Sequence, residues 1–263
     1  MNKTSKLLFV PAFLLILLAC NALAAPATPT AMPTSTSIPT ATPAPLYQQV
    51  TLTAVPFGET GKSPDYNITA QIPSLTGSND PRAAAFTTEM HNFVQGLISD
   101  FKTKLAQNPP TPITAASYLD VKYQLVSPPG NVLSVKFATE GYLAGMAHPY
   151  HLIYSFNYDL EQGKDIPFSS LFLSNADYLS AISQYCIAQL KTRDIGFGDI
   201  FAQGAEPTAQ NYKNWNITTD GLMITFDEYQ VAPYVAGPQT VTISYSELKS
   251  LIDPKGPLGS FVK

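Results

Sequence analysis

The sequence predicts an α+β fold in which one long and one medium helix pack on antiparallel sheets. Three observations carry this prediction. Segments that alternate apolar and polar residues outnumber helical segments, short turn signals separate neighbouring strand segments, and two segments carry apolar residues at spacings of three and four. Neighbouring strands joined by short turns pair antiparallel, and a few helices then pack on the resulting sheets.

The first half of the folded part begins with two predicted strands, at residues 48–57 and 65–75. A long helix follows, because Asp80 is a favourable N-cap, Pro81 suits the first turn, and two prolines at 109 and 110 end the helix. Its buried face is marked by apolar residues spaced by three and four: Phe86, Met90, Phe93, Val94, Leu97, Ile98, Phe101 and Leu105. Three further strands are predicted at residues 117–127, 131–143 and 149–160.

The second half contains the medium helix. We predict that it begins at Ser174, with Asp177 in the capping-box position and Cys186 on its apolar face. Cys186 is therefore expected to be a buried structural residue and not a disulfide partner. A tight hairpin is predicted around Asp220 and Gly221, followed by a strand at residues 239–245 and a short helix at residues 246–252.

The composition excludes one class of function. Charged residues make up 13% of the 263 residues, the formal net charge is −4, and no run of lysine and arginine occurs. Removal of an N-terminal segment that carries Lys3 and Lys6 would lower the net charge by two, from −4 to −6. Because nucleic-acid binding needs clustered basic side chains against phosphates, no nucleic-acid partner is expected.

Residues 1–20 have the order of an export signal. A short basic start precedes an apolar run over residues 7–19, which is too short to cross a bilayer comfortably. The segment ends in "LLAC", which resembles the bacterial lipobox, in which the cysteine thiol is lipidated and the signal is cut before it. We therefore expect lipidation at Cys20, membrane lipid as a partner, and a position on the outer face of the cytoplasmic membrane in the cell envelope. The alternative is an ordinary signal that is cut after residue 22, 24 or 25.

A tether is predicted between the signal and the folded part. Residues 21–45 are rich in Pro, Thr, Ala and Ser, so they cannot build a core, and the prolines favour an extended chain. At about 3.1 Å per residue, such a tether reaches roughly 80 Å. It would hold a folded domain away from the membrane.

Three stretches together resemble one family. They are "GYLAGMAHPYH" (141–151), "FNYDLEQGKDIPFSSLF" (156–172) and "FDEYQVAPYVAGPQTVTISYSEL" (226–248). Their order is similar to the extracellular part of RsiV-type, lysozyme-sensing anti-sigma factors, and to the paired domains of unknown function that precede the catalytic domain of PdaC-type peptidoglycan deacetylases. The positions that match the family pattern are Gly145, Ala147, His148, Asn157, Asp159, Leu160, Gly163, Lys164, Glu228, Tyr229, Ala232, Pro233, Tyr234 and Gly237. The first stretch departs from the pattern at Ala144, Met146 and Pro149.

The resemblance implies an RsiV-ectodomain-like fold with two subdomains. The first, similar to the PdaC and RsiV domains, would cover residues 46–152, and the C-terminal domain of unknown function would cover residues 153–263. No catalytic deacetylase domain and no sigma-binding segment accompany these stretches, so we expect the exported module alone. In the sensors of this family, that module binds lysozyme.

The two histidines of the first stretch allow several roles. In a regular strand, His148 and His151 would point to opposite faces and could not chelate one metal ion. No established metal spacing and no Gly-x-Ser-x-Gly elbow is present, so no metal site, cofactor or catalytic residue is expected. His148 would be a structural, hydrogen-bonded histidine at a glycine-shaped turn, or a residue that contacts a ligand. We expect His151 to be less important than His148.

The third stretch carries tyrosines of the kind that are enriched at interfaces. Tyr229 and Tyr234 could equally pack in the core, with their hydroxyls hydrogen-bonded. The leading hypothesis is a surface-tethered, non-catalytic binding module for lysozyme-like proteins or cell-wall glycan (peptidoglycan). Its candidate ligand-contacting or motif residues are Gly145, His148, Glu228, Tyr229, Pro233, Tyr234 and Gly237. The alternatives are a cell-wall hydrolase or deacetylase-type enzyme that uses His148 with Glu228 or Asp159, and a purely structural envelope lipoprotein.

Overall fold

The structure is a computed structural model of the chain, and it describes residues 44–107, 115–193, 195 and 200–262. The predicted export signal, the predicted lipidation site at Cys20 and nearly all of the predicted tether lie outside these described residues. The segment Pro43–Lys263 forms one compact unit. In the part of this unit that the structure describes, no helix is both long and apolar enough to span a bilayer.

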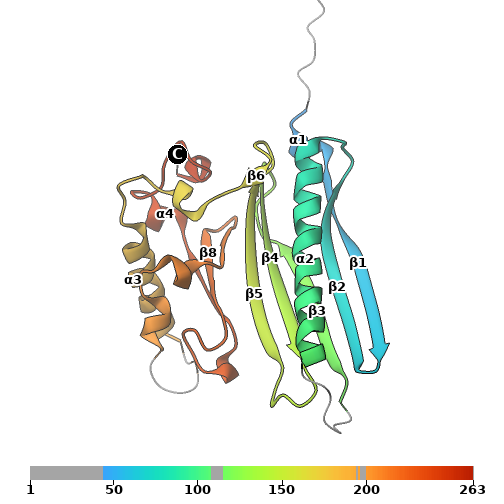
Figure 1. Cartoon of the computed structure of the whole chain (residues 1–263). Helices are drawn as coiled ribbons and strands as arrows, with labels where there is room; N and C mark the ends of the chain where they lie inside the picture. Colours follow the sequence, from blue (N-terminus) through green and yellow to red (C-terminus); the bar gives the residue numbers. More distant parts are fainter. Residues whose placement is uncertain (1–43, 108–114, 194, 196–199, 263) are drawn as a thin grey trace, which may run out of the picture. The chain divides into compact units, whose positions relative to one another are not determined.

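A six-stranded sheet forms the first part of this unit (Figure 1). In spatial order its strands are β1 (Thr51–Lys62), β2 (Asp65–Thr76), β3 (Ser117–Leu125), β4 (Val132–Tyr142), β5 (Tyr150–Asp159) and β6 (Lys164–Asp165). All neighbours pair antiparallel except β2 and β3, which are parallel. The helix α2 (Pro81–Gln107) connects these two strands, and parallel neighbours require such a crossover. The predicted α+β class is confirmed, with one parallel pair added.

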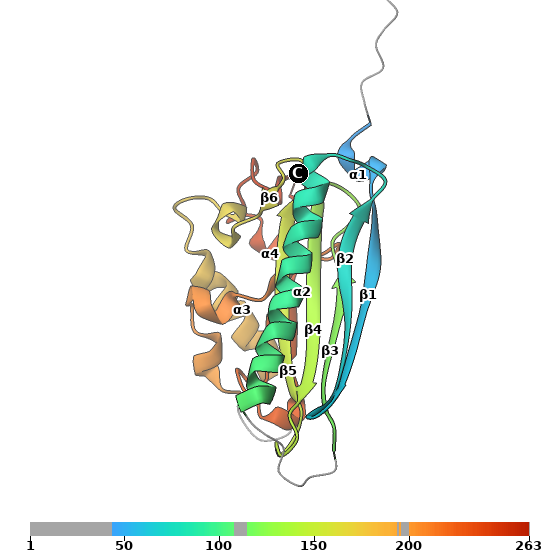
Figure 2. The same cartoon turned by 45° about the vertical axis from the view of Figure 1, so that its right-hand side comes forward.

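Helix α2 covers one face of this sheet (Figure 2). Its first turn begins as predicted, because the Asp80 carboxylate accepts a hydrogen bond from the backbone N–H of Arg82 at 2.9 Å. The predicted apolar stripe packs against β2, β3, β4 and β5, and all its residues are buried except Phe93 and Leu97, which are partly buried. Phe93 contacts three aromatic rings of the sheet. Its ring centroid lies within 5.1 Å of the ring centroids of Phe137, Tyr154 and Phe156. A short helix, α1 (Leu46–Gln49), precedes β1 and buries Leu46 in the same core.

One carboxyl on α2 makes stability depend on pH. Burial, together with the negative charge of Asp165, raises the pKa of Glu89 from 4.5 to about 7. The folded state therefore holds this proton more tightly than the unfolded chain, so the contribution of Glu89 to stability falls as the pH rises from 4.5 to 7. We expect Glu89→Gln to raise the free energy of unfolding at pH 8 by roughly 1 to 2 kcal/mol, after allowance for partial exposure. Urea unfolding at pH 5 and pH 8 measures this. Glu206→Gln, at an exposed site, should leave the pH dependence unchanged, and an equal effect of both variants would contradict the assignment.

A three-stranded antiparallel sheet and the remaining helices form the second part of the unit. Its strands are β7 (Trp215–Ile217), β8 (Leu222–Phe226) and β9 (Gln239–Ile243), and its α-helices are α3 (Tyr178–Lys191) and α4 (Tyr245–Leu248). Five short 3₁₀ helices accompany them: η1 (Phe168–Leu171), η2 (Ala202–Ala205), η3 (Ala209–Tyr212), η4 (Tyr234–Ala236) and η5 (Gly259–Phe261). The predicted role of Cys186 is confirmed, because it is fully buried in the core of this part and burial raises the pKa of its thiol to about 12.

Two local predictions in this part were wrong in position. The medium helix begins at Tyr178, not at Ser174, and Asp177 is its N-cap, accepting a hydrogen bond from the backbone N–H of Ser180. The preceding residues form a separate turn, in which the N–H of Ala176 donates to the carbonyl of Leu173 at 3.0 Å. The N–H of Leu173 in turn donates to the carbonyl of Leu251 at 2.8 Å. The hairpin between β7 and β8 is tight, but its turn lies one residue earlier than predicted: the N–H of Thr218 donates to the carbonyl of Gly221 at 3.0 Å, so residues 219 and 220 form the turn.

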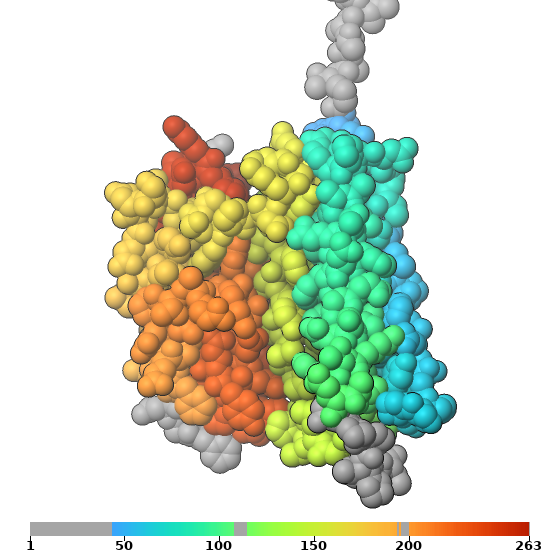
Figure 3. Space-filling view, in the orientation of Figure 1, coloured from blue at the N-terminus to red at the C-terminus, as the bar shows by residue number. Residues whose placement is uncertain are grey.

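The second part of the unit, coloured orange to red, lies beside β5 (Figures 1 and 3). Buried polar side chains join the two sheets where β7 contacts β4 and β5. Asn157 on β5 is 5% exposed. Its carbonyl oxygen accepts from the Ser134 hydroxyl at 2.6 Å and from the Ile217 N–H at 3.3 Å, and its amide donates to the carbonyl of Trp215 at 2.8 Å. Asn216 is fully buried and donates to Ser134 at 2.9 Å. This network fixes β7 against β4 and β5.

The expected boundary between residues 152 and 153 falls inside β5. The six-stranded sheet therefore continues past that boundary to β6, which ends at Asp165. Part of the segment that the sequence assigned to the C-terminal domain, residues 153–165, completes the first sheet.

Candidate functional site

Two loops that are distant in the sequence, residues 141–151 and 226–238, meet in the structure. One carboxylate oxygen of Glu228 accepts a hydrogen bond from the backbone N–H of His151 at 3.0 Å. The other oxygen lies 2.5 Å from Nδ1 of the same histidine. The Glu228 carboxylate thus contacts both the backbone and the ring of His151, and it holds the imidazole in one orientation. The Glu228 side chain is 9% exposed, so this pair joins the loops at a nearly buried contact.

Tyr234 makes a second contact between the loops. Its hydroxyl donates to the carbonyl of Pro149 at 3.0 Å, and Nδ1 of His148 lies 2.7 Å from the same oxygen. The Tyr234 ring centroid is 4.0 Å from that of His148 and 6.3 Å from that of His151. One tyrosine therefore lies against both histidines.

The register of the first sheet adds a second carboxylate. Glu140 on β4 and His151 on β5 are directly paired, so their side chains lie on the same face, opposite α2. Nε2 of His151 lies 3.7 Å from Glu140, whose carboxylate also accepts a hydrogen bond from the Tyr118 hydroxyl at 2.6 Å. The imidazole of His151 thus lies between Glu140 from the first sheet and Glu228 from the loop after β8.

The carboxylates also act on the tyrosines. The hydrogen bond to Glu140 raises the pKa of Tyr118 to about 12. Desolvation, and to a smaller extent the charge of Glu228, raises the pKa of Tyr234. Both phenols therefore remain protonated at neutral pH, where they donate hydrogen bonds and are poor nucleophiles.

The loop after β8 owes its shape to its backbone. Pro233 is the N-cap of η4, and Gly237, with φ of 62°, ends it. Gly145 has φ of 101° in the other loop, which suits a glycine at a tight turn.

Tyr229 has φ of 62°, a left-handed conformation that is uncommon for a bulky residue. Its side chain is 57% exposed and lies 5.8 Å from the Tyr234 ring. A strained, exposed aromatic residue of this kind is typical of functional surfaces.

Tyr229→Gly should separate stability from binding. Glycine adopts positive φ freely, so we expect the free energy of unfolding to stay unchanged or rise by about 1 kcal/mol. The same change removes an exposed ring, so the affinity for a ligand that contacts this loop should fall about tenfold. Chemical denaturation and titration calorimetry measure the two effects. A loss of stability would show that the Tyr229 ring packs as a structural residue.

Two shallow hollows adjoin the His151–Glu228 pair. The larger, of about 460 Å³, is lined by His151, Glu228 and residues 234–238. The smaller, of about 230 Å³, is lined by His151, Pro238 and side chains of β3, β4 and β5, namely Asp120, Lys122, Ala138, Thr139, Glu140 and Ile153. His151 and Pro238 line both hollows, so the hollows lie side by side. Val235, which is 71% exposed, lies at the edge of the larger hollow.

The structure brings most of the predicted residues together but changes their roles. His148, Glu228, Tyr229, Tyr234 and His151 form one cluster of contacts. The two histidines would point to opposite faces in a regular strand, but His148 lies in the loop before β5, so that expectation does not apply here. It is His151, and not His148, that contacts Glu228, and the relative importance of the two histidines for function stays a prediction.

The middle stretch of the family pattern is architectural. Asn157 joins the two sheets, as described above. Asp159 accepts hydrogen bonds from the backbone N–H groups of Glu161 and Gln162 at 2.9 and 3.0 Å, and Gly163 follows with φ of 66°. Asp159 thus shapes the turn into β6 and does not approach either histidine.

Sequence reasoning missed Glu140 and Tyr118. The signal that could have found them is the alternation of β4 and β5, which places Glu140 opposite His151 once the register is known. Within the residues that the structure describes, no group of three or more His, Cys, Asp or Glu side chains is arranged to hold a metal ion.

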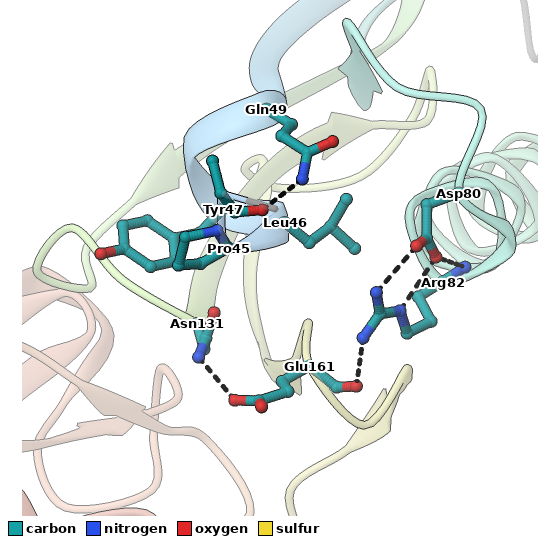
Figure 4. Close-up of a pocket in the computed structure, with 9 residues that line it drawn as sticks. Pro45, Leu46, Tyr47, Gln49, Asp80, Arg82, Asn131 and Glu161 are labelled. Atoms are coloured by element: carbon teal, nitrogen blue, oxygen red, sulfur yellow. Dashed lines mark hydrogen bonds and ion pairs between the residues drawn. The ribbon is translucent and has the colours of Figure 1, made fainter. Parts of the chain in front are cut away.

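A separate cavity of about 440 Å³ lies where α1 approaches the start of α2 (Figure 4). Its charged groups bind one another. The Arg82 guanidinium donates to Asp80 at 2.7 and 2.9 Å and to the carbonyl of Glu161 at 2.8 Å, and the Asn131 amide donates to the Glu161 carboxylate at 2.8 Å. Arg82 holds the pKa of Asp80 at about 2. These contacts fasten the first turn of α2 to the turn between β5 and β6.

Part of the chain matches a known sequence family. Residues 169–246 match the family described as "Protein of unknown function (DUF3298)". The match runs from η1 to α4 and includes the loop at 226–238. The chain therefore contains a DUF3298 domain.

Three individual proteins extend the comparison. The peptidoglycan-N-acetylmuramic acid deacetylase PdaC of Bacillus subtilis is 30% identical over 141 residues, which are 53% of this chain and 30% of the deacetylase. The chain thus matches less than a third of that enzyme's length. The immunogenic protein MPT64 of Mycobacterium tuberculosis is 24% identical over 192 residues, which are 72% of this chain and 79% of MPT64. A crystal structure of a DUF3298 family member from Bacteroides fragilis covers 81% of this chain and 97% of its own, with a TM-score of 0.63 and 17% identity. This likeness confirms the fold.

Proposed function

We propose that the chain is an exported, envelope-tethered and non-catalytic binding module. Its binding surface is formed by the loops 141–151 and 226–238. The observation that carries this proposal is the His151–Glu228 pair, which fixes both loops beside two open hollows and the exposed side chains of Tyr229 and Val235. Exposed aromatic and apolar side chains around pre-ordered polar groups are typical of binding surfaces.

A lysozyme-like protein is the partner that the charges favour. Asp120, Glu140 and Glu228 line the two hollows, and Lys122 is the cation among the lining residues. Lys122 already forms an ion pair with Asp120. An excess of carboxylates on the surface of a chain with net charge −4 complements a basic protein, both in steering and in the final contact.

Cell-wall glycan is the second candidate partner. The match to a protein named a peptidoglycan deacetylase supports it. Tyrosine rings and carboxylates also suit a saccharide, since rings pack on its apolar face and carboxylates accept from its hydroxyls. The hollows are open to solvent and would leave most of such a chain accessible.

The geometry favours binding over hydrolysis. A hydrolase that used His148 with Glu228 would need the two to interact, but both oxygens of Glu228 contact His151. Nδ1 of His148 lies against the carbonyl of Pro149. The Asp159 carboxylate accepts hydrogen bonds from the backbone N–H groups of Glu161 and Gln162 in its own turn. These contacts position side chains for recognition and leave His148 without an acidic partner among the described residues.

Titration calorimetry of the full chain tests the proposal. We expect saturable heat with lysozyme, or with soluble peptidoglycan fragments, and no turnover of those fragments over the same period. The absence of heat with both ligands would contradict the binding function. Turnover of a wall fragment that is lost in His148→Ala would support the hydrolase instead.

Lipidation at Cys20 is part of the same proposal, because it supplies the attachment to the membrane. Intact mass spectrometry of the protein extracted from membranes should show the mass of a diacylglycerol on this residue. A chain with an unmodified Cys20 thiol, or one cut after it, would contradict the tethered arrangement.

A further inference from the structure

The smaller hollow beside His151 has the composition of a pocket for one basic side chain. Ala138 and Ile153, a directly paired couple on β4 and β5, supply an apolar surface, and Pro238 from the loop before β9 lines the other side. The next couple on the same face, two residues along each strand, is Glu140 and His151. Successive residues on one face are about 6.6 Å apart, so an apolar section leads directly to a carboxylate.

Glu140 is available as the counter-charge. Its side chain is 45% exposed, and its carboxylate is oriented by the Tyr118 hydroxyl at 2.6 Å. Glu140 has a long contact of 3.7 Å with Nε2 of His151 and interacts with the charge of Lys122, whereas Asp120 pairs directly with Lys122 and accepts a hydrogen bond from Thr69 at 2.8 Å. Glu228 is nearly buried and occupied by His151. Glu140 is thus the carboxylate of this surface that combines exposure with a fixed orientation.

We infer that this hollow binds the side chain of an arginine or lysine on the partner protein, with Glu140 as its ionic acceptor. This inference rests on the proposed binding function and specifies how a protein partner is recognised. The hydrocarbon stem would lie along Ala138, Ile153 and Pro238, as long basic side chains commonly lie along apolar surface. The charged head would reach Glu140, where a hydrogen bond between two ions is stronger than one between neutral groups. The volume of about 230 Å³ is sufficient for one such side chain.

The first arm of the test measures the affinity of lysozyme for full-chain variants. Glu140→Gln keeps an acceptor for Tyr118 but loses the charge, so we expect affinity to fall at least about tenfold and its salt dependence to decrease. Glu161→Gln is the matched control, because it removes the same charge at the far end of β5, a strand of ten residues that spans about 33 Å. It should change affinity less than about twofold. An equal loss in both variants would overturn the inference, since it would show a general effect of net charge.

The second arm does not depend on lysozyme. N-acetyl-arginine methylamide and its lysine counterpart are titrated into the full chain, and the methyl resonances of Ile153 and the ring resonances of His151 are followed by NMR. We expect saturable shifts that Glu140→Gln abolishes and that the uncharged citrulline analogue does not produce. If lysozyme fails to bind but these shifts appear, the lysozyme partner is wrong and the pocket stands. If neither basic probe shifts Ile153, or if soluble glycan fragments shift it instead, the inference is overturned.

Discussion

Asn157→Ala is expected to lower the free energy of unfolding by about 3 kcal/mol, because it leaves several buried polar groups without partners. The side chain accepts from Ser134 and Ile217 and donates to the carbonyl of Trp215, all at the junction of the two sheets. Water cannot replace these bonds easily, since Asn157 is 5% exposed. Trp215 is the single tryptophan of the chain, so its fluorescence during urea unfolding reports directly on this junction.

Asn131→Ala serves as the matched control for this effect. Asn131 is partly exposed and bonds to the Glu161 side chain at the surface, so its loss should cost less than about 1 kcal/mol. Similar losses for the two variants would contradict the role assigned to the junction. A loss of tryptophan signal at lower urea than the loss of helical circular dichroism would show that the second part of the unit detaches first.

Tyr234→Ala is expected to give the largest loss of binding, at least about thirtyfold in affinity for the partner. Tyr234 lies against His148 and His151, contacts Tyr229, and holds the carbonyl of Pro149, so its removal releases both loops at once. Titration calorimetry with whichever ligand binds the wild-type chain measures the loss.

Tyr234→Phe separates the ring from the hydroxyl. The ring contacts with both histidines persist, and one hydrogen bond to Pro149 is lost, so affinity should fall less than about fivefold. If Tyr234→Ala binds as well as the wild-type chain, the surface around residues 226–238 is not the binding surface.

Much of the fold is readable from the sequence, because its signals are local. The spacing of Phe86, Met90 and Phe101 predicts α2 and its buried face, and all three are fully or almost fully buried. The parallel pairing of β2 with β3 has no comparable local signal, since it depends on α2 crossing the sheet. The start of α3 was placed too early because residues 173–176 form a turn of their own, and the bond that holds Leu173 there comes from Leu251, which is far away in the sequence.

The sequence predicted which segments form the candidate site but not how their side chains contact one another. The two stretches at 141–151 and 226–238 were recognised, and the structure brings them together. Nothing in the sequence singles out His151, because its contacts follow from the register of β4 with β5, which places it opposite Glu140, and from its hydrogen bond with Glu228. The contact between His151 and Glu228 joins residues 77 positions apart, so it cannot be derived from spacing along the chain.

Hydrogen–deuterium exchange of the full chain, with and without a saturating ligand, tests the binding surface most directly. The account predicts that lysozyme or peptidoglycan fragments slow exchange in residues 141–151 and 226–238, with little change in α2 or along β1. Slower exchange at α2 or β1, with none in the two loops, would contradict it.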